Sequence, residues 1–197
     1  IKIIKGQEVL KINHKNKKVK NIILKNNIEI KVDSLVCNAD PPKVYDELIY
    51  PKIQNKLFKL KCNRLKYSMG LYVFYFGTKK KYENIEHHTI YLGKSHRKLL
   101  NKIFYTKELD DDFSYYLHRP SATDPDMAPA GKDCFYVLVP VPNNQSKINW
   151  KSQGYDFKKK VIKKLEETSM PKLSKYIEAE IFISPDYFEE ELNTKHG

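Results

Sequence analysis

The sequence is poor in the residues that build disulfide and zinc frameworks. Its three cysteines, Cys37, Cys62 and Cys134, lie far apart with no paired spacing, so they predict neither a disulfide framework nor a zinc site. No apolar run approaches the roughly 20 residues that span a bilayer, and no signal-peptide pattern is visible. We therefore expect a chain suited to the reducing cytoplasm, whose contact with a membrane is peripheral.

Self-sufficient catalytic motifs are absent as well. The sequence contains no GxGxxG fingerprint, no GxxxxGK[ST] phosphate loop, no HExxH and no GxSxG. It begins at Ile1 without an initiator methionine, which favours an excised stretch of a longer protein. If that protein is an enzyme, we expect its cofactor to be held mainly by sequence outside this stretch.

Arginine is scarce despite a net charge of +12. Of 36 basic Lys and Arg residues, only Arg64, Arg97 and Arg119 are arginines. Surfaces that bind nucleic acid favour arginine, because its planar fork pairs with phosphates and guanines through two hydrogen bonds. The lysines are spread along the whole chain, which is typical of solvated faces, and a nucleic-acid partner is not expected.

Residues 1–40 have the pattern of a small β-meander. Apolar and polar residues alternate in three stretches, residues 7–13, 19–25 and 28–32, which are joined by tight polar turns. The apolar run Leu35-Val36-Cys37 predicts a buried strand after them. Pro41-Pro42 then opens a helix, a second helix is predicted over residues 51–61, and residues 41–66 are expected to be a helical connection.

Residues 67–197 read as strands mixed with helices. Strands are predicted at residues 68–77, 87–92, 113–119, 134–141 and 177–183, and helices from Ser95 through Phe104, over residues 150–168 and after Ser184. This order predicts an α+β fold, with a mostly antiparallel sheet covered by helices on one face.

The histidine pair His87-His88 is the first candidate site. Adjacent residues on a strand face opposite ways, so strand geometry alone cannot direct both imidazoles to one metal. We expect one histidine to pack in the sheet and the other to lie at the surface, and we expect no metal site. His118 and Arg119 end a strand and enter a loop of the kind that often carries functional groups, although its Asp-Pro and Ala-Pro pairs are also ordinary turn chemistry.

The predicted strands are unusually aromatic. The rings belong to Tyr72, Phe74, Tyr75, Phe76, Tyr115, Tyr116, Phe135 and Tyr136. They form either an ordinary core or the wall of an apolar channel for a long hydrophobic ligand. The pattern by itself favours neither reading.

Several runs together resemble the bacterial phytoene desaturase (carotenoid desaturase) family. The central runs are Leu117-His118-Arg119-Pro120-Ser121-Ala122-Thr123-Asp124-Pro125, Ala128-Pro129-Ala130-Gly131 and Phe135-Tyr136-Val137-Leu138-Val139-Pro140-Val141-Pro142-Asn143. Flanking runs follow in the expected order: Val36-Cys37-Asn38-Ala39-Asp40, Phe74-Tyr75-Phe76-Gly77, His87-His88-Thr89-Ile90 and Ser184-Pro185-Asp186-Tyr187-Phe188. The resemblance covers nearly the whole chain.

The resemblance implies an FAD-dependent flavoprotein of the amine-oxidase-like superfamily. Residues 1–40 would be the middle meander of its FAD-binding domain, and residues 67–197 its inserted substrate-binding domain. Val9 would contact the adenine through its backbone, and Asn38, Ala39 and Asp40 would end a strand near the cofactor. The N- and C-terminal FAD-binding segments of the family are not in this sequence, so we expect the stretch alone to be inactive and FAD to be bound by the complete protein.

The implied reaction removes hydrogen from adjacent carbons of a hydrophobic C40 polyene, converting phytoene toward lycopene. Expected substrate contacts are Tyr72, Phe74, Phe76, His87, Tyr116, Phe135 and Val137. The catalytic residue is not identified by the resemblance, and His118 and Arg119 are candidates only.

A substrate that resides in the bilayer implies peripheral contact with the inner face of the cell membrane. Residues 52–66 mix lysines with Leu57, Phe58 and Leu60 and are either a membrane patch or a helix packed on the sheet. Two alternatives remain open: a desaturase of a C30 or related polyene, and a non-catalytic lipid- or nucleic-acid-binding module.

Overall fold

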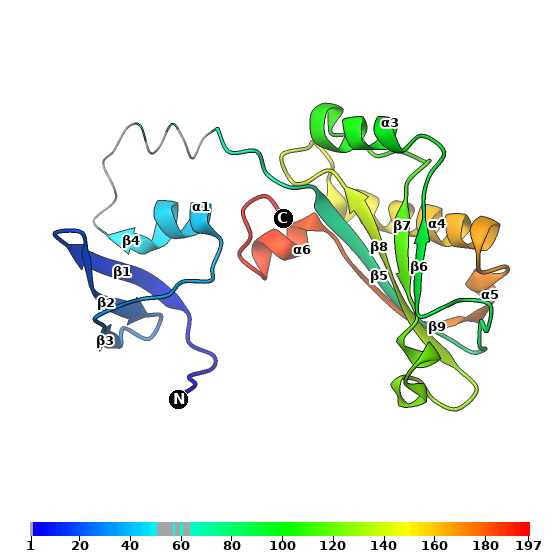
Figure 1. Cartoon of the computed structure of the whole chain (residues 1–197), viewed down its shortest axis with the longest axis horizontal. Helices are drawn as coiled ribbons and strands as arrows, with labels where there is room; N and C mark the ends of the chain where they lie inside the picture. Colours follow the sequence, from blue (N-terminus) through cyan, green and yellow to red (C-terminus); the bar gives the residue numbers. More distant parts are fainter. Residues whose placement is uncertain (1, 51–56, 58–59, 61–63) are drawn as a thin grey trace. The chain divides into compact units, whose positions relative to one another are not determined.

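The structure, a computed structural model, describes residues 2–50, 57, 60 and 64–197. The chain divides into two compact units, one of residues 1–66 with 193–195 and one of residues 67–192 with 196–197. Within the described residues, each unit holds one β-sheet (Figure 1). Of the helices that the structure describes, none combines the length and the apolar character that crossing a bilayer requires.

The first unit contains the predicted meander. Its elements are β1 (Val9–Lys15), β2 (Lys18–Leu24), β3 (Glu29–Lys31), α1 (Pro41–Lys43), the π-helical turn η1 (Val44–Leu48) and β4 (Ile49–Tyr50). The sheet order is β3-β2-β1-β4, with β1, β2 and β3 antiparallel. Asn16 and Lys17 both have positive φ, as a tight hairpin turn between β1 and β2 requires.

The predicted buried strand at Leu35-Val36-Cys37 is wrong. These residues form no strand, and Val36 is 97% exposed. The fourth position in the sheet is taken by β4, which pairs parallel to β1 through Ile12 and Ile49. Among the described residues no strand pairs with the apolar triplet, and a short apolar run needs such a partner in order to be buried as a strand. The predicted helix over residues 51–61 lies outside the described residues, apart from Leu57 and Leu60.

The second unit is an α+β layer structure, as predicted. Its elements are β5 (Gly70–Thr78), β6 (His88–Tyr91), α3 (His96–Asn101), the π-helical turn η2 (Lys102–Thr106), β7 (Tyr115–His118), the 3-10 turns η3 (Pro120–Ala122) and η4 (Pro125–Met127), β8 (Asp133–Val141), α4 (Trp150–Thr168), α5 (Leu173–Tyr176), β9 (Ile177–Ile183) and α6 (Pro185–Glu190). The strand order is β6-β7-β8-β5-β9, and every pair is antiparallel.

One face of this sheet is covered by α4, which runs across it in Figure 1. Helical spacing places Trp150, Phe157, Val161 and Leu165 on one side of α4, and all four are buried. They belong to one core cluster with inward-facing residues of β5, β7 and β8. Burying each large apolar side chain contributes roughly 1.5–3 kcal/mol, so this layer is the main source of the unit's stability.

The helix approaches the sheet closely at Gly154. A Cβ at this position would lie 2.8 Å from the ring of Phe182 in β9. The Gly154 carbonyl accepts a hydrogen bond of 3.0 Å from the Tyr72 hydroxyl. The absence of a side chain therefore lets α4 sit against β9 and β5.

The other face of the sheet, called the open face below, has a different character. Pairing across the strands brings His88, Tyr116, His118, Tyr136, Tyr75 and Ile181 to this face. Tyr75 is 41% exposed and Ile181 63% exposed. Aromatic and aliphatic groups are thus presented to the surface on the side away from α4.

Candidate functional site

A pocket of about 500 Å³ lies on the open face. Its lining includes Tyr75, His118, Cys134, Tyr136, Ala179 and Ile181, together with Met127 of the η4 turn. Tyr75 and Tyr136 are cross-strand partners whose ring centroids lie 5.6 Å apart. Because most of the lining is apolar, the pocket fits a hydrophobic ligand with few polar groups.

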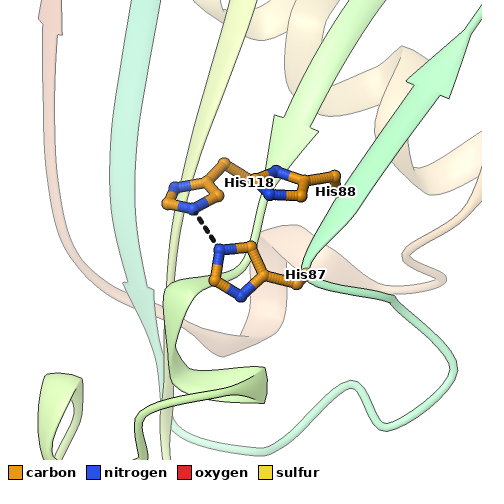
Figure 2. Close-up of side chains that lie close together, drawn as sticks. All are labelled: His87, His88 and His118. Carbon is orange, nitrogen blue, oxygen red and sulfur yellow. Dashed lines mark hydrogen bonds between the residues drawn. The ribbon is translucent and has the colours of Figure 1, made fainter.

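Three histidines meet beside this pocket (Figure 2). One ring nitrogen from each of His87, His88 and His118 lies within 4.8 Å of the others. Nε2 of His118 lies 2.8 Å from Nε2 of His87, and the rings of His118 and His88 stack with centroids 5.3 Å apart. The three side chains form one cluster, called the histidine cluster below.

The remaining nitrogens of two rings are held by hydroxyl groups. Nδ1 of His87 forms a short hydrogen bond with Oγ1 of Thr123, in the loop after β7. Nδ1 of His88 forms a hydrogen bond of 2.6 Å with the Tyr116 hydroxyl on β7. These contacts fix the orientation of both imidazoles.

The third ring, that of His118, lies in a more buried environment. Burial lowers the pKa of His118 below its ordinary value, and the nearby His87 and His88 lower it further. His118 is therefore favoured as a neutral imidazole at neutral pH. Its Nδ1 is buried and has no hydrogen-bond partner within the described residues.

The expectation that His87 and His88 point apart is wrong. It treated both residues as part of one strand, but β6 begins at His88 and His87 lies in the bend before it. Strand alternation does not apply across that boundary, so both rings turn toward His118. The predicted absence of a metal site depended on this alternation, and that reasoning no longer holds.

The predicted substrate contacts divide between the two faces. His87 and Tyr116 lie in or beside the histidine cluster. Five others, Tyr72, Phe74, Phe76, Phe135 and Val137, are at most 4% exposed and belong to the core cluster packed with α4. Substrate binding by these five stays a prediction: all five belong to the core cluster, and Phe76 and Phe135 also contribute to the lining of the pocket.

Arg119 lies in a buried ion pair rather than in the pocket. Its Nε is 3.0 Å from Oδ2 of Asp133, and its Nη1 donates a hydrogen bond of 2.9 Å to the Ile85 carbonyl. Asp133 also accepts hydrogen bonds from the Tyr82 N–H and the Ser121 hydroxyl. These contacts hold the loop after β7 against the sheet, so a structural function accounts for Arg119. Its predicted catalytic role stays a prediction.

The predicted cofactor contacts all lie in the first unit. Val9 is the first residue of β1, and Asn38 and Ala39 are exposed in the irregular segment before α1. Oδ2 of Asp40 accepts a hydrogen bond of 2.5 Å from the backbone N–H of Lys195. Contact of Val9, Asn38, Ala39 and Asp40 with a cofactor stays a prediction.

Of the residues that line the pocket from the open face, the sequence indicated Tyr75 and Tyr136 only as part of an aromatic core or channel wall, and it did not indicate Cys134 and Ile181. Tyr75, Cys134, Tyr136 and Ile181 are alternate positions of strands whose other positions form the core. The two-residue period identified the strands, but both sets of positions in β5 are apolar. The exposed Ile181 among the charged residues of β9 was the available signal.

The chain is similar in sequence to curated carotenoid desaturases. It is 36% identical over 176 residues to a neurosporene-forming phytoene desaturase of Rhodobacter capsulatus, covering 87% of this chain and 34% of that protein. It is 31% identical over 191 residues to a lycopene-forming phytoene desaturase of a Paracoccus species, covering 96% of this chain and 38% of that protein. A 4,4'-diapophytoene desaturase (4,4'-diapolycopene-forming) of a Methylomonas species is 32% identical over 183 residues, covering 92% and 36%. The chain thus spans about a third of the length of these relatives.

Solved structures share the fold. An oxidoreductase from Methanosarcina mazei matches with a TM-score of 0.62 at 17% identity, over 91% of this chain and 36% of that one. A variant of putrescine oxidase matches with a TM-score of 0.56 at 9% identity, over 94% of this chain and 35% of the oxidase chain. No family model matches the chain. The structural matches are consistent with the predicted α+β class.

Proposed function

The chain belongs to the phytoene desaturase family over the stretch that it shares with those relatives, and we propose that it contributes the polyene-binding part of an FAD-dependent carotenoid desaturase. The complete enzyme removes hydrogen from adjacent carbons of phytoene or a closely related polyene. The observation that carries the proposal is the open face, where an aromatic and aliphatic surface surrounds an apolar pocket.

The open face suits a flat, conjugated hydrocarbon. The rings of Tyr75, Tyr136 and Tyr116 form a row across β5, β8 and β7, with neighbouring centroids 5.6 and 5.7 Å apart. Aromatic rings supply a large apolar area with few rotatable bonds. A polyene laid along this row would bury apolar surface on both sides, and the desolvation would stabilise the complex.

FAD, bound by the complete protein, would supply the hydride-accepting chemistry of the reaction. In this chain, Val9, Asn38 and Ala39 are the residues proposed to contact it, and Asp40 would help to place that segment. The protein's part is to hold the polyene in place and to exclude water. His118 lines the pocket and is favoured as a neutral imidazole, so it is the better of the two predicted candidates for accepting a proton.

Membrane contact is proposed for a second surface, on α3 and η2. A hollow of about 930 Å³ there is lined by Lys94, Arg97, Lys98, Phe104 and Tyr105, among others. Tyr105 is 76% exposed. Basic groups mixed with exposed aromatic rings favour the headgroup region of anionic bilayers. This surface supports a peripheral position on the inner face of the cell membrane, where the substrate dissolves.

Conversion of a colourless polyene by the complete gene tests the proposal. The gene would be expressed in one host that accumulates phytoene and in a second that accumulates the C30 analogue, with pigments identified by chromatography and absorption. We expect products with longer conjugation in at least one host, and the C30 alternative predicts conversion in the second host alone. Absence of conversion in both would contradict the desaturase proposal.

Paired variants test the placement of the substrate. Ile181→Glu puts a charge on the open face beside the pocket and should strongly reduce conversion. Tyr155→Glu is the matched control, because Tyr155 lies on α4 and is 62% exposed. Equal conversion by both variants, at equal protein levels, would show that the polyene does not use the open face.

A liposome experiment tests the membrane surface separately. Tyr105→Ser should weaken sedimentation with anionic vesicles, whereas Tyr155→Ser should not. A non-catalytic nucleic-acid-binding module would instead bind single-stranded DNA with a steep dependence on salt, since that slope reports phosphate neutralisation.

A further inference from the structure

We propose that His87, His88 and His118 bind one divalent transition-metal cation of the zinc type. The observation behind the proposal is the arrangement of three imidazoles on the open face, which does not depend on the desaturase activity, although a bound cation would exclude His118 from the proton-accepting role considered above. Figure 2 shows the three rings converging from the start of β6 and the end of β7. One nitrogen of each ring lies within 4.8 Å of the others.

The spacing is close to what a metal requires. Zinc binds histidine nitrogens at about 2.0–2.1 Å in tetrahedral geometry, which puts two ligand nitrogens about 3.3 Å apart. Nε2 of His87 and Nε2 of His118 are 2.8 Å apart, so small ring movements would admit a cation between them. His88 is exposed and His87 is only partly buried, and neither ring belongs to the buried core, so a small shift of either ring would not disturb the core.

The outer contacts follow the usual pattern of histidine ligands. A metal-bound imidazole normally directs its second nitrogen to a hydrogen-bonding partner, which fixes the ring and its tautomer. His87 and His88 have such partners in Thr123 Oγ1 and the Tyr116 hydroxyl, both through Nδ1. With the Nδ1 atoms engaged, the Nε2 atoms of these two rings are the ones available to a cation.

The ligand chemistry selects the class of cation. The group contains three imidazoles and no carboxylate or thiolate. Imidazole suits zinc, copper and nickel, whereas magnesium and calcium prefer oxygen ligands. Three protein ligands on a partly exposed surface leave a fourth position for water, as in zinc sites with open coordination.

A bound cation would connect parts of the chain that are distant in sequence. It would join the start of β6 to the end of β7 and, through Thr123, to the loop beside the pocket. It would also occupy His118, which would then be unable to accept a proton. The site is therefore expected to stiffen this edge of the pocket.

Titration of the chelator-treated, metal-free chain with zinc chloride tests the proposal. We expect one equivalent to bind by calorimetry, a higher melting temperature on binding, and the visible absorption of tetrahedral cobalt when Co²⁺ replaces Zn²⁺. His88→Gln should weaken binding at least tenfold, because it removes a ligand. As His88 is exposed, this variant should keep its fold, which circular dichroism would verify.

Two further variants make the result specific. His96→Gln is the matched control, because His96 is exposed on α3 and lies outside the cluster. It should bind zinc as the wild type does. Tyr116→Phe keeps all three ligands but removes the partner of His88, and should weaken binding by a smaller factor than His88→Gln. Failure to bind zinc, or equal loss in His88→Gln and His96→Gln, would overturn the proposal.

Discussion

Replacing Asp133 by asparagine removes the charge from a carboxylate that folding has taken out of water. Asp133 is 1% exposed, and its Oδ2 lies 3.0 Å from Nε of Arg119 and accepts a hydrogen bond of 2.7 Å from the Tyr82 N–H. Its Oδ1 accepts a hydrogen bond of 2.9 Å from the Ser121 hydroxyl. Arg119 is 7% exposed, so the substitution leaves a buried guanidinium without its counter-charge.

The expected loss of unfolding free energy is large. Removing one partner of a buried ion pair costs about 3–5 kcal/mol, a substantial part of the roughly 5–15 kcal/mol that stabilises a typical domain. With a urea slope of about 2 kcal/mol per molar, the unfolding midpoint of Asp133→Asn should fall by about 2 M. Fluorescence of Trp150 reports this transition, because it is the one tryptophan of the sequence and is buried in the core of the second unit.

Two companion variants distinguish charge burial from general damage. Arg119→Met combined with Asp133→Asn should be more stable than Asp133→Asn alone, because no unpaired charge stays buried. Glu190→Gln breaks an exposed pair with Lys151 and should change the unfolding free energy by less than about 1 kcal/mol. If the unfolding free energy of Asp133→Asn lies within about 1 kcal/mol of the wild-type value, the buried pair does not hold this loop as described.

Three further perturbations have definite expected outcomes. Phe74→Ala empties a fully buried site and should lower the unfolding free energy by about 3–5 kcal/mol, as measured by urea titration; a loss near zero would contradict its place in the core. Burial, with smaller effects of nearby charged groups, raises the pKa of Tyr82 to about 12. The neutral phenol is therefore favoured in the folded state, so the unfolding free energy should be retained below about pH 10 and fall toward pH 12. Tyr82→Phe should reduce this alkaline loss, and an unchanged dependence of the unfolding free energy on pH would refute the assignment. Gly154→Ala gains about 1 kcal/mol of helix propensity, but the new Cβ would lie 2.8 Å from the Phe182 ring, an overlap that costs about 1–3 kcal/mol. The urea midpoint of unfolding should therefore not rise when Gly154→Ala is made alone, but it should rise when Gly154→Ala is added to Phe182→Leu. A rise in both backgrounds would show that the Phe182 ring moves aside without cost.

Elements with a strong local period could be predicted from the sequence. The helix over residues 150–168 and the strand over residues 177–183 were predicted with the bounds that the structure shows. Both have apolar residues at a fixed spacing between clear end signals, so local chemistry defines them. The run at residues 35–37 failed, because a strand also needs a partner and only the tertiary structure assigns that place to β4.

The candidate site was harder to predict for a similar reason. Tyr75 and Phe74 are neighbours on one strand, and both are aromatic, so the sequence does not indicate which of them faces α4. The histidine cluster depends on where β6 begins, and a shift of one residue decides whether His87 follows the strand alternation. Element ends are the least certain part of any pattern-based prediction, and here one of them determines the geometry of the site.

The position of β5 between β8 and β9 in the five-stranded sheet has a consequence for how the second unit folds. Tyr75 pairs with Tyr136 of β8 on one side and with Ile181 of β9 on the other. During synthesis, β5 is therefore made well before either of the strands that pair with it. Pairings between residues so distant along the chain form slowly. Until those partners are made, the exposed aromatic strand is at risk of pairing with other chains. We therefore expect chaperones to bind the nascent chain at residues 70–78.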